Sequence, residues 1–442
     1  MKKGFGYAIG IVLLLAAAGG AWFFLTLGER GIPTAVAGGD AAMIGKQKVL
    51  KAVFADEGQG LRHTEILITQ DNRPRVLSSI DYPEPGVKRK EISVAVDASA
   101  LKLSDGPATL TLAAVDYSLW KNRTVVTMDV RIDFMPPQIS QFNPQNHINP
   151  AGACVVTYGL SEAAVRTGVQ VGDLFYPGYP LTAAGRPVYV AYFALPMEAG
   201  PGNPQIRILA EDPAGNQTLS AIPALIKKRK FRSDTMNLSD AFLEKKMPEF
   251  QADIPALRGK TPLETFTHIN TRLRDDNCQM LQSICRKTEP RQLWNDTFLR
   301  MKNAAPMALF GDRRTYRYQG KAVGESLHTG VDLASLAHSP VEAANSGIVR
   351  FAGPMGICGN SVVIDHGLGL STLYSHLSAI QVRPEQAVAR GEVIGTSGMT
   401  GLAGGDHLHF GVAIHGQFVD PREWWDPHWI ADNVTLKMAA AQ

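Results

Sequence analysis

The chain has 442 residues, of which 45% are hydrophobic and 19% are charged, and its net charge is +3. A chain of this length exceeds one ordinary hydrophobic core and predicts about three folding units. The small net charge gives no support to nucleic-acid binding, which usually requires a strongly basic surface. A mildly basic protein is compatible with a partner that carries carboxylates, but the charge alone does not indicate one.

The N-terminus resembles a membrane anchor. Lys2 and Lys3 precede an uncharged run from Gly4 to Gly28. About 20 apolar residues are enough to cross a bilayer core as a helix, and lysines before the run predict a cytoplasmic N-terminus. We therefore expect residues 1–29 to form a short cytoplasmic stub and a single-pass anchor in the inner membrane, with the bulk of the chain in the periplasm. A cleaved signal peptide is the alternative, with the small residues at 16–21 as its cleavage region.

Residues 30–136 and 137–232 are predicted to form two β-sandwiches. Both regions consist of short segments in which apolar and polar residues alternate, separated by turn residues. In each region a strand ends in Asp, a turn follows, and Asn begins the next strand. These residues are Asp116, Asn122, Asp212 and Asn216. The pattern resembles bacterial immunoglobulin-like domains and indicates a duplicated module.

Residues 233–303 are predicted to be a helical segment. Ser239–Phe250 and Pro262–Asn277 have helical spacing of apolar residues, and Thr261 has the character of an N-cap before a first-turn proline. We expect this segment to pack on the C-terminal region and to cover its groove. The basic cluster before it, residues 227–232, fits a solvated linker, and contact with anionic lipid or wall carboxylates is the alternative.

Histidines concentrate in residues 304–430, where eight of the eleven lie. Three short motifs stand out there: His328-Thr-Gly-Val-Asp332, Tyr374-Ser-His376-Leu377 and His407-Leu-His409. The residues around the last motif alternate as in a half-buried strand, which places its two histidines on one face. Imidazole and carboxylate are common zinc ligands, whereas the four cysteines lack zinc-finger spacing.

Each motif is weak alone, but in this order and in a glycine-rich β region they resemble the lysostaphin-type, or LytM-like, family of zinc metallopeptidases, which are peptidoglycan endopeptidases. The resemblance covers about residues 320–425. It implies a compact β-sheet domain with an open groove, here residues 304–430, before a short tail at 431–442. It also implies a Zn²⁺ cofactor and a role for each histidine and for the aspartate of the three motifs. The implied metal ligands are His328, Asp332 and His409, and the implied catalytic pair is His376 and His407.

Two positions depart from the family pattern. Asp406 stands where proline is common, and Gly411 stands where an acidic residue often follows. Neither position supplies a ligand, so we expect effects on the shape of the groove. His366 ends a strand at a turn and is expected to be structural.

The fold class expected from these observations is mainly β: an N-terminal transmembrane helix, two immunoglobulin-like sandwiches, a short helical segment and a lysostaphin-like peptidase domain. The resemblance implies a membrane-anchored zinc metalloendopeptidase that hydrolyses peptide cross-links of peptidoglycan through a zinc-activated water. Two alternatives stay open. One is a non-enzymatic activator of another wall hydrolase, and the other is an envelope scaffold in which the sandwiches do the work. The sequence does not decide which of His376 and His407 is the general base.

Overall fold

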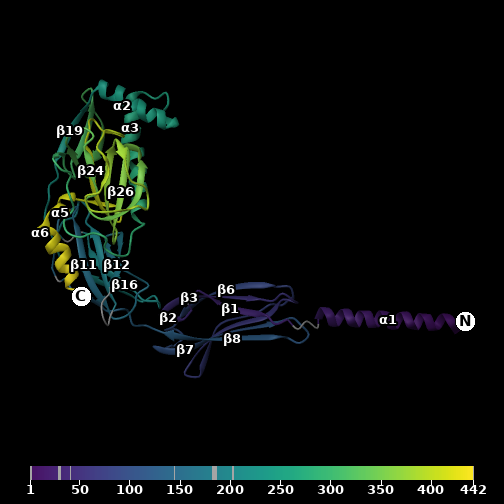
Figure 1. The fold of residues 1–442 in the computed structure, drawn as a ribbon. Coiled ribbons are helices and arrows are strands. Elements are labelled where there is room, and N and C mark those ends of the chain that lie inside the picture. The colour runs from purple at the N-terminus through teal and green to yellow at the C-terminus, as the bar shows by residue number, and fades with distance from the viewer. Residues whose placement is uncertain are drawn as a thin grey trace. The chain divides into compact units, whose positions relative to one another are not determined.

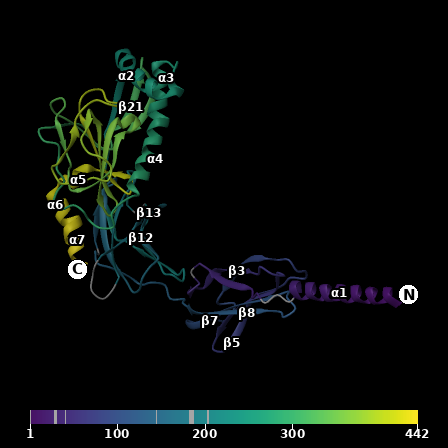
Figure 2. The ribbon, with the colours of Figure 1, turned by 45° about the vertical axis from the view of Figure 1, so that its right-hand side comes forward.

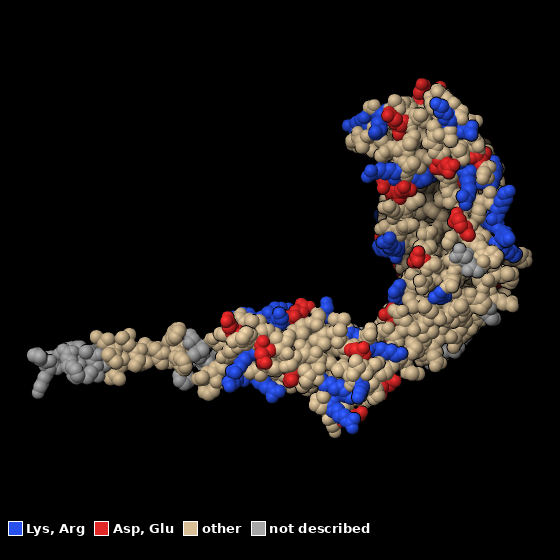
Figure 3. Space-filling model, turned by 180° about the vertical axis from the view of Figure 1, so that it is seen from behind, with Lys and Arg blue, Asp and Glu red and all other residues tan. Residues whose placement is uncertain are grey.

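The computed structural model describes residues 2–27, 31–39, 41–143, 145–181, 187–201 and 204–441 (Figure 1). The fold is mainly β with few helices, as predicted. The chain divides into two compact units. The first is Met1–Pro137 with Glu211–Gln217, and the second is Gln138–Ala210 with Thr218–Gln442. On the face in Figure 3, Lys and Arg are interspersed with Asp and Glu over both units.

Helix α1 spans Lys2–Leu27. Its described side chains, those of residues 11–23, are all uncharged. In the described part of the chain, we find no helix that combines the length and the apolar character needed to cross a membrane. Residues 1, 28 and 29 of the expected stub and anchor lie outside the described residues. The anchor therefore stays a prediction.

The N-terminal unit is a sandwich of two sheets, with strand orders β1-β3-β6 and β2-β8-β7-β4-β5. The strands are β1 (Thr34–Gly38), β2 (Met43–Ile44), β3 (Gln47–Ala55), β4 (Leu61–Gln70), β5 (Arg73–Asp81), β6 (Arg89–Asp97), β7 (Gly106–Asp116) and β8 (Arg123–Ile132). Alternate residues of both sheets point into one core, in which Phe54, Ile66 and Leu110 are buried. The sandwich arrangement follows the sequence pattern, and its immunoglobulin-like class stays a prediction.

The two Asp–Asn turns noted in the sequence close in the same way. Asn122 Nδ2 donates to Asp116 Oδ2 at 2.9 Å, and Asn216 Nδ2 donates to Asp212 Oδ2 at 2.9 Å. In each turn the Asp N–H also donates to the Asn carbonyl at 3.1 Å. This shared geometry explains why the two regions carry the same short motif.

The second unit begins with another pair of sheets, with strand orders β14-β15-β11-β9 and β13-β12-β16-β17, and a β10-β18 ribbon. The strands are β9 (Ile139–Gln141), β10 (Asn146–Ile148), β11 (Ala153–Leu160), β12 (Arg166–Val171), β13 (Leu174–Pro177), β14 (Tyr179–Leu181), β15 (Val188–Ala194), β16 (Ile206–Glu211), β17 (Gln217–Ala221) and β18 (Ala224–Ile226). Tyr192 of β15 stacks on Trp424 with ring centroids 6.4 Å apart. Because Trp424 belongs to the C-terminal region, the second sandwich and the large C-terminal sheet share one hydrophobic core.

A large antiparallel sheet forms the centre of the C-terminal region, with the order β20-β23-β31-β27-β26-β25-β29 and β32 paired to β31. Two small sheets, β19-β21-β22 and β24-β30-β28, flank it. The strands are β19 (Ser233–Leu238), β20 (Ala305–Ala308), β21 (Arg313–Tyr318), β22 (Lys321–Leu327), β23 (Val331–Ala334), β24 (Pro340–Glu342), β25 (Gly347–Pro354), β26 (Asn360–Gly367), β27 (Leu370–Leu377), β28 (Ala379–Ile380), β29 (Ala387–Val388), β30 (Val393–Thr396), β31 (Leu408–Ile414) and β32 (Gln417–Val419). Short helices α5 (Pro421–Trp425), α6 (Pro427–Ile430) and α7 (Leu436–Ala439) end the chain.

Helices form in the middle of the predicted helical segment, residues 233–303, but the segment is not helical throughout: Ser233–Leu238 is strand β19, and residues 286–303 form neither helix nor strand. Helix α2 (Asp240–Asp253) begins at Ser239, whose hydroxyl accepts from the Phe242 N–H. Helix α3 (Pro262–His268) begins at Thr261, which forms a capping box with Glu264. A π-helical turn joins α3 to α4 (Arg274–Cys285), and Figure 2 shows α4 alongside the C-terminal sheet.

These helices pack on the loops that surround the motifs. The Ile357 N–H, in the loop between β25 and β26, donates to Asn277 Oδ1 of α4 at 2.8 Å. Lys246 of α2 is buried, and its Nζ donates to the Met399 carbonyl at 2.7 Å. The helical segment is thus fixed to both loops by polar contacts.

Candidate metal centre and active site

Asp332 and His409 are brought together by strand register. Strands β23 and β31 are antiparallel neighbours, and Asp332 pairs directly with His409. Paired residues point to the same face of a sheet, so the two side chains meet above it. His409 Nδ1 lies 2.8 Å from Asp332 Oδ1.

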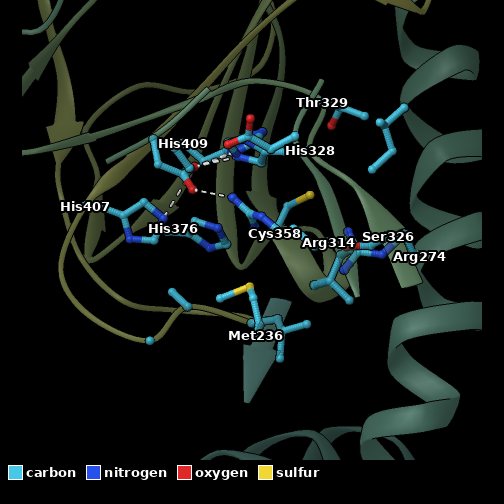
Figure 4. Close-up of a pocket in the computed structure, with 18 of the residues that line it drawn as sticks. Met236, Arg274, Arg314, Ser326, His328, Thr329, Cys358, His376, His407 and His409 are labelled. Atoms are coloured by element: carbon cyan, nitrogen blue, oxygen red, sulfur yellow. Dashed lines mark hydrogen bonds and ion pairs between the residues drawn. The ribbon is translucent and has the colours of Figure 1, made fainter. Parts of the chain in front are cut away.

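His328 completes the group from the loop between β22 and β23 (Figure 4). Its Nδ1 lies 2.8 Å from the Leu309 carbonyl, which can only accept, so Nδ1 carries a proton. In the neutral ring Nε2 then bears a lone pair, and it lies 2.9 Å from Asp332 Oδ1 and 3.0 Å from His409 Nδ1. Lone pairs this close repel each other unless a cation or an extra proton lies between them.

This donor set fits a divalent metal ion. The three side chains are buried, and their ligand atoms all lie within 4.8 Å of one another. Two imidazole nitrogens and one carboxylate oxygen are normal zinc ligands, and one cation could reach all three atoms at about 2.0–2.2 Å. The hydrogen bond from His328 to the Leu309 carbonyl is the outer contact that commonly fixes the tautomer of a ligating histidine.

Gly330 leaves room for this group. A Cβ at this position would lie 2.4 Å from the Phe410 carbonyl oxygen and 2.7 Å from His409 Nε2. Any side chain there would push the His409 ring away from its partners. The glycine between His328 and Asp332 is therefore a packing requirement of the cluster.

The protonation states also suit a metal. Burial raises the pKa of Asp332, but the neighbouring imidazoles of His328 and His409 outweigh burial and hold this pKa well below its ordinary value. Burial lowers the pKa of His409 to about 4, against the opposing effect of Asp332. At neutral pH the pair is therefore a carboxylate and a neutral imidazole, the forms that coordinate metals.

Arg314 on β21 is a partner of the cluster that the sequence did not reveal. Its Nη2 donates to Asp332 Oδ2 at 3.1 Å, while Oδ1 faces the two histidines. Both side chains are largely buried, with 19% and 13% of their surface exposed. The guanidinium holds the carboxylate in orientation and leaves one oxygen for the cluster. No sequence motif distinguishes Arg314 from the neighbouring Arg313, so only its position in the folded sheet shows that it contacts Asp332.

His376 and His407 lie beside the cluster and face each other, with ring centroids 4.8 Å apart. His376 has a left-handed backbone, with φ of 64°, and its Nδ1 donates to the Thr400 carbonyl at 2.8 Å. The Nδ1 of His407 donates to the Gly405 carbonyl at 2.9 Å. Each neutral ring therefore keeps an Nε2 lone pair, and that of His407 lies 3.6 Å from Asp332 Oδ1.

Burial, with the nearby imidazoles of His407 and His409, lowers the pKa of His376 to about 3. The ring is therefore neutral at physiological pH. The structure thus brings together all five side chains singled out from the sequence, from strands and loops up to 81 positions apart.

The other sequence-noted positions have structural contacts. Asp406 accepts from the Ser397 hydroxyl at 2.6 Å and from the His338 N–H at 3.2 Å, and so joins two loops. His366 is fully buried, and its ring nitrogens contact the Ser346 carbonyl and the Thr372 hydroxyl, both at 2.8 Å. These contacts agree with the structural role expected for His366.

A cavity of about 660 Å³ opens at the cluster. One wall is the large sheet with the histidines, and the opposite wall is one face of the small sheet β19-β21-β22. Most of the residues of that sheet that line the cavity alternate along their strands, as expected for one face: Asp234, Met236, Leu238, Arg314, Tyr316 and Ser326. Helices α2, α3 and α4 supply part of the remaining boundary through Phe242, Phe266 and Arg274, and the loops at residues 355–358 and 402–406 supply the rest. The cluster therefore faces a groove rather than a sealed core.

A group of two histidines and one aspartate that could hold a metal ion, on the wall of a β-sheet groove, is the kind of site that metallopeptidases use. Residues 326–421 match the family model "Peptidase family M23", and this C-terminal domain is an M23 metallopeptidase domain. The resemblance to lysostaphin-type peptidases is thereby confirmed, and zinc is the metal of this family.

Two curated relatives match the same region. The DD-carboxypeptidase/endopeptidase Mpg of Neisseria meningitidis is 47% identical over 95 residues, which are 22% of this chain and 22% of the relative. The peptidoglycan DD-endopeptidase ShyA of Vibrio cholerae is 41% identical over 93 residues, 21% of this chain and 22% of the relative. The matches thus span about a fifth of the length of these relatives. The solved catalytic domain of lysostaphin from Staphylococcus simulans is 28% identical, with a TM-score of 0.24, over 28% of this chain and 92% of that one.

Proposed function

We propose that this chain is a zinc metalloendopeptidase that hydrolyses the peptide cross-links of peptidoglycan. The observation that carries the proposal is the group of three ligand atoms from His328, Asp332 and His409 at the edge of an open groove. The relatives Mpg and ShyA, named as endopeptidases, support the choice of substrate. In this proposal the three side chains hold the metal, and His376 and His407 act on the substrate.

A bound Zn²⁺ would supply Lewis acidity and would lower the pKa of the attacking water to about 7. The protein supplies the rest. Arg314 keeps the Asp332 carboxylate aimed at the cluster, and the Leu309 carbonyl keeps His328 in one tautomer. These contacts hold the ligands in place before substrate arrives, which is the usual way in which outer residues assist a metal site.

His376 and His407 are placed to move protons. Their Nδ1 atoms are held by backbone carbonyls, so each ring presents Nε2 with a free lone pair. Hydrolysis requires one proton to leave the attacking water and one to reach the departing amine. An Nε2 that accepts the first proton can donate it in the second step. We propose that this pair performs both transfers.

We also propose that α1 anchors the chain in the inner membrane with the catalytic domain in the periplasm. Lys2 and Lys3 ahead of the uncharged run support this orientation. The helical segment would then cover the groove, because α2 and α4 contact the loops at Met399 and Ile357. Substrate entry would require these contacts to loosen.

Digestion of purified peptidoglycan by the full chain, with and without a chelator, tests the proposal. We expect soluble muropeptides whose masses correspond to cleaved cross-links, and no release once the metal is removed. If the zinc-loaded protein releases nothing but stimulates another wall hydrolase, the activator alternative is correct. If His328→Ala with His409→Ala leaves the cellular phenotype unchanged, the scaffold alternative is correct.

A further inference from the structure

Arg274 extends into the groove at the end opposite His376 and His407. Figure 4 shows the two histidines on one side of the pocket and Arg274, Arg314 and Ser326 together on the other, with His328 and His409 between them. Arg274 begins helix α4 and is only partly buried. When the reacting carbonyl of a peptide lies at the cluster, only the residues on one side of the cleaved bond (one flank) can reach Arg274.

The Arg274 side chain is oriented by neutral groups. Its Nε donates to the Asn270 carbonyl at 3.3 Å and its Nη2 to Asn270 Oδ1 at 3.0 Å. Asn270 is buried and donates in turn to the Glu325 carbonyl at 3.1 Å. Across the described ranges of the chain, Arg274 forms no ion pair and Nη1 contacts no protein acceptor. The guanidinium is thus held in place with part of its donor capacity unused.

None of the carboxylates that line the groove contacts Arg274, and each of them has another partner. Asp332 is held by Arg314, Asp406 by the Ser397 hydroxyl, Asp312 by the Leu309 N–H and Asp234 by Arg232. A hydroxyl donor stands near Arg314: Ser326 pairs with Arg314 across β21 and β22, and its Oγ lies 3.0 Å from the Tyr316 hydroxyl. This end of the groove therefore combines an unpaired cation with polar donors.

We infer that Arg274, with Ser326, forms a subsite for a carboxylate of the substrate. The inference rests on the proposed function and deepens it: the preferred substrate is a peptide with a free carboxylate on one flank of the cleaved bond. An arginine fork matches a carboxylate in geometry, and a hydrogen bond to a charged group contributes more than a neutral one. The site would discriminate against amidated peptides.

The test compares peptide analogues in binding. Cross-linked stem dimers are made with an uncleavable reduced amide, in three forms: all carboxylates free, those on one flank amidated, and those on the other flank amidated. The Kd for the zinc-loaded full chain is measured by calorimetry. We expect amidation of one flank to weaken binding about 10-fold to 100-fold and amidation of the other to change it little.

Variants then assign the effect to Arg274. Arg274→Gln should bind the free and amidated forms with equal, weakened affinity, and Arg274→Lys should recover part of the preference. Arg272→Gln is the matched control, because Arg272 is exposed on the π-helical turn just before α4 and does not line the groove. Equal affinity of the wild type for all three analogues, or an unchanged preference in Arg274→Gln, overturns the inference.

Binding separates this inference from the proposed function. Release of muropeptides from peptidoglycan tests hydrolysis, and the Kd ratio of the uncleavable analogues tests the subsite whether or not hydrolysis occurs. A chain that binds no analogue at all also overturns the subsite. A chain that shows the expected ratio but never cleaves the natural dimer overturns only the hydrolase.

Discussion

Asp332 and His409 are paired residues on adjacent antiparallel strands, with Asp332 Oδ1 and His409 Nδ1 2.8 Å apart. Two strands that are distant in the sequence thus supply two of the three ligand atoms through backbone register alone. A one-residue shift in that register would turn one of these side chains to the other face of the sheet. The pairing of β23 with β31 therefore fixes two of the three residues of the candidate metal site.

Replacing Asp332 with Asn, or His409 with Ala, should abolish zinc binding and hydrolysis together. Each change removes a ligand from a group of three, and the remaining two donors cannot hold the ion tightly. Metal content per chain by mass spectrometry, with release of muropeptides, provides the measurement. His338→Ala is the matched control, since that imidazole is 70% exposed and lies outside the cluster. Full zinc occupancy in either ligand variant would contradict the assignment.

His376→Ala and His407→Ala should each lower kcat by about 10²–10⁴ while zinc stays bound. Neither side chain belongs to the group of three, so the metal keeps its ligands. Steady-state kinetics on a cross-linked dimer and the zinc content of the same samples test this. Loss of zinc in either variant would show that this histidine binds the metal and does not act in proton transfer alone.

Arg314→Gln should weaken zinc binding about 10-fold to 100-fold, the usual effect of losing an outer-sphere partner. The change removes the contact that holds Asp332 Oδ2 and lets the carboxylate rotate. Competition with a chromophoric chelator gives the zinc Kd. Arg313→Gln is the control, because the neighbouring side chain is exposed and its ion pair with Glu198 lies on the surface. Equal affinity in the two variants would show that Arg314 does not orient the ligand.

The sequence predicted the five site residues because their three motifs, in this order, resemble those of lysostaphin-type peptidases. His407 and His409 share a strand face, and only three residues, Thr329, Gly330 and Val331, separate His328 from Asp332. The mainly β class and the helix at Thr261 also followed from local signals, namely period-two alternation and an N-cap. Features that depend on residues close together in the sequence could therefore be predicted from the sequence.

The contacts that the sequence did not reveal are all non-local. Arg314 and Arg274 carry no motif, and each reaches the groove only because β21 and α4 fold against the sheet. The core shared by the second sandwich and the peptidase domain was likewise not foreseen, since it depends on Trp424 packing against Tyr192. Contacts between residues that are far apart in the sequence leave no periodic pattern in the sequence from which they could be predicted.

Glu423 should make the stability of the chain depend on pH. Burial raises the pKa of this carboxyl to about 7, against the opposing hydrogen bonds from the Ala153 N–H at 2.8 Å and Asn149 Nδ2 at 3.0 Å. A raised pKa means that the folded state favours the protonated form. The stabilisation is therefore complete below the ordinary pKa of about 4.5 and is lost as the pH rises through about 7.

Over that interval the wild type should lose up to about 3 kcal/mol relative to Glu423→Gln, which cannot ionise. Denaturant unfolding of both proteins from pH 4.5 to 8 measures the difference. Glu244→Gln, at an exposed position on α2, serves as the control and should follow the wild type. If the free energy of unfolding depends on pH in the same way for the wild type and Glu423→Gln, this carboxyl does not titrate between pH 4.5 and 8.

Lys246→Met should open the groove. Lys246 is buried, and its Nζ joins α2 to the Met399 carbonyl beside the active site. A hydrogen bond from a charged group contributes about 1.5–3 kcal/mol, so its loss would raise the population of an open helical segment by about tenfold or more. Cross-linked wall is bulky and needs the open form, so its digestion should accelerate more than cleavage of a short dimer.

A variant at one residue is a sharper test than removal of the helical segment. Strand β19 lies in the same sheet as β21 and β22, and Trp294 is part of the hydrophobic core. A chain that began at residue 305 would lose both and would expose that core. Initial rates on whole peptidoglycan and on the dimer are compared for Lys246→Met and for Lys245→Met, whose side chain is exposed. If the two variants digest wall at the wild-type rate, the helices are a fixed wall of the groove and not a cover that moves.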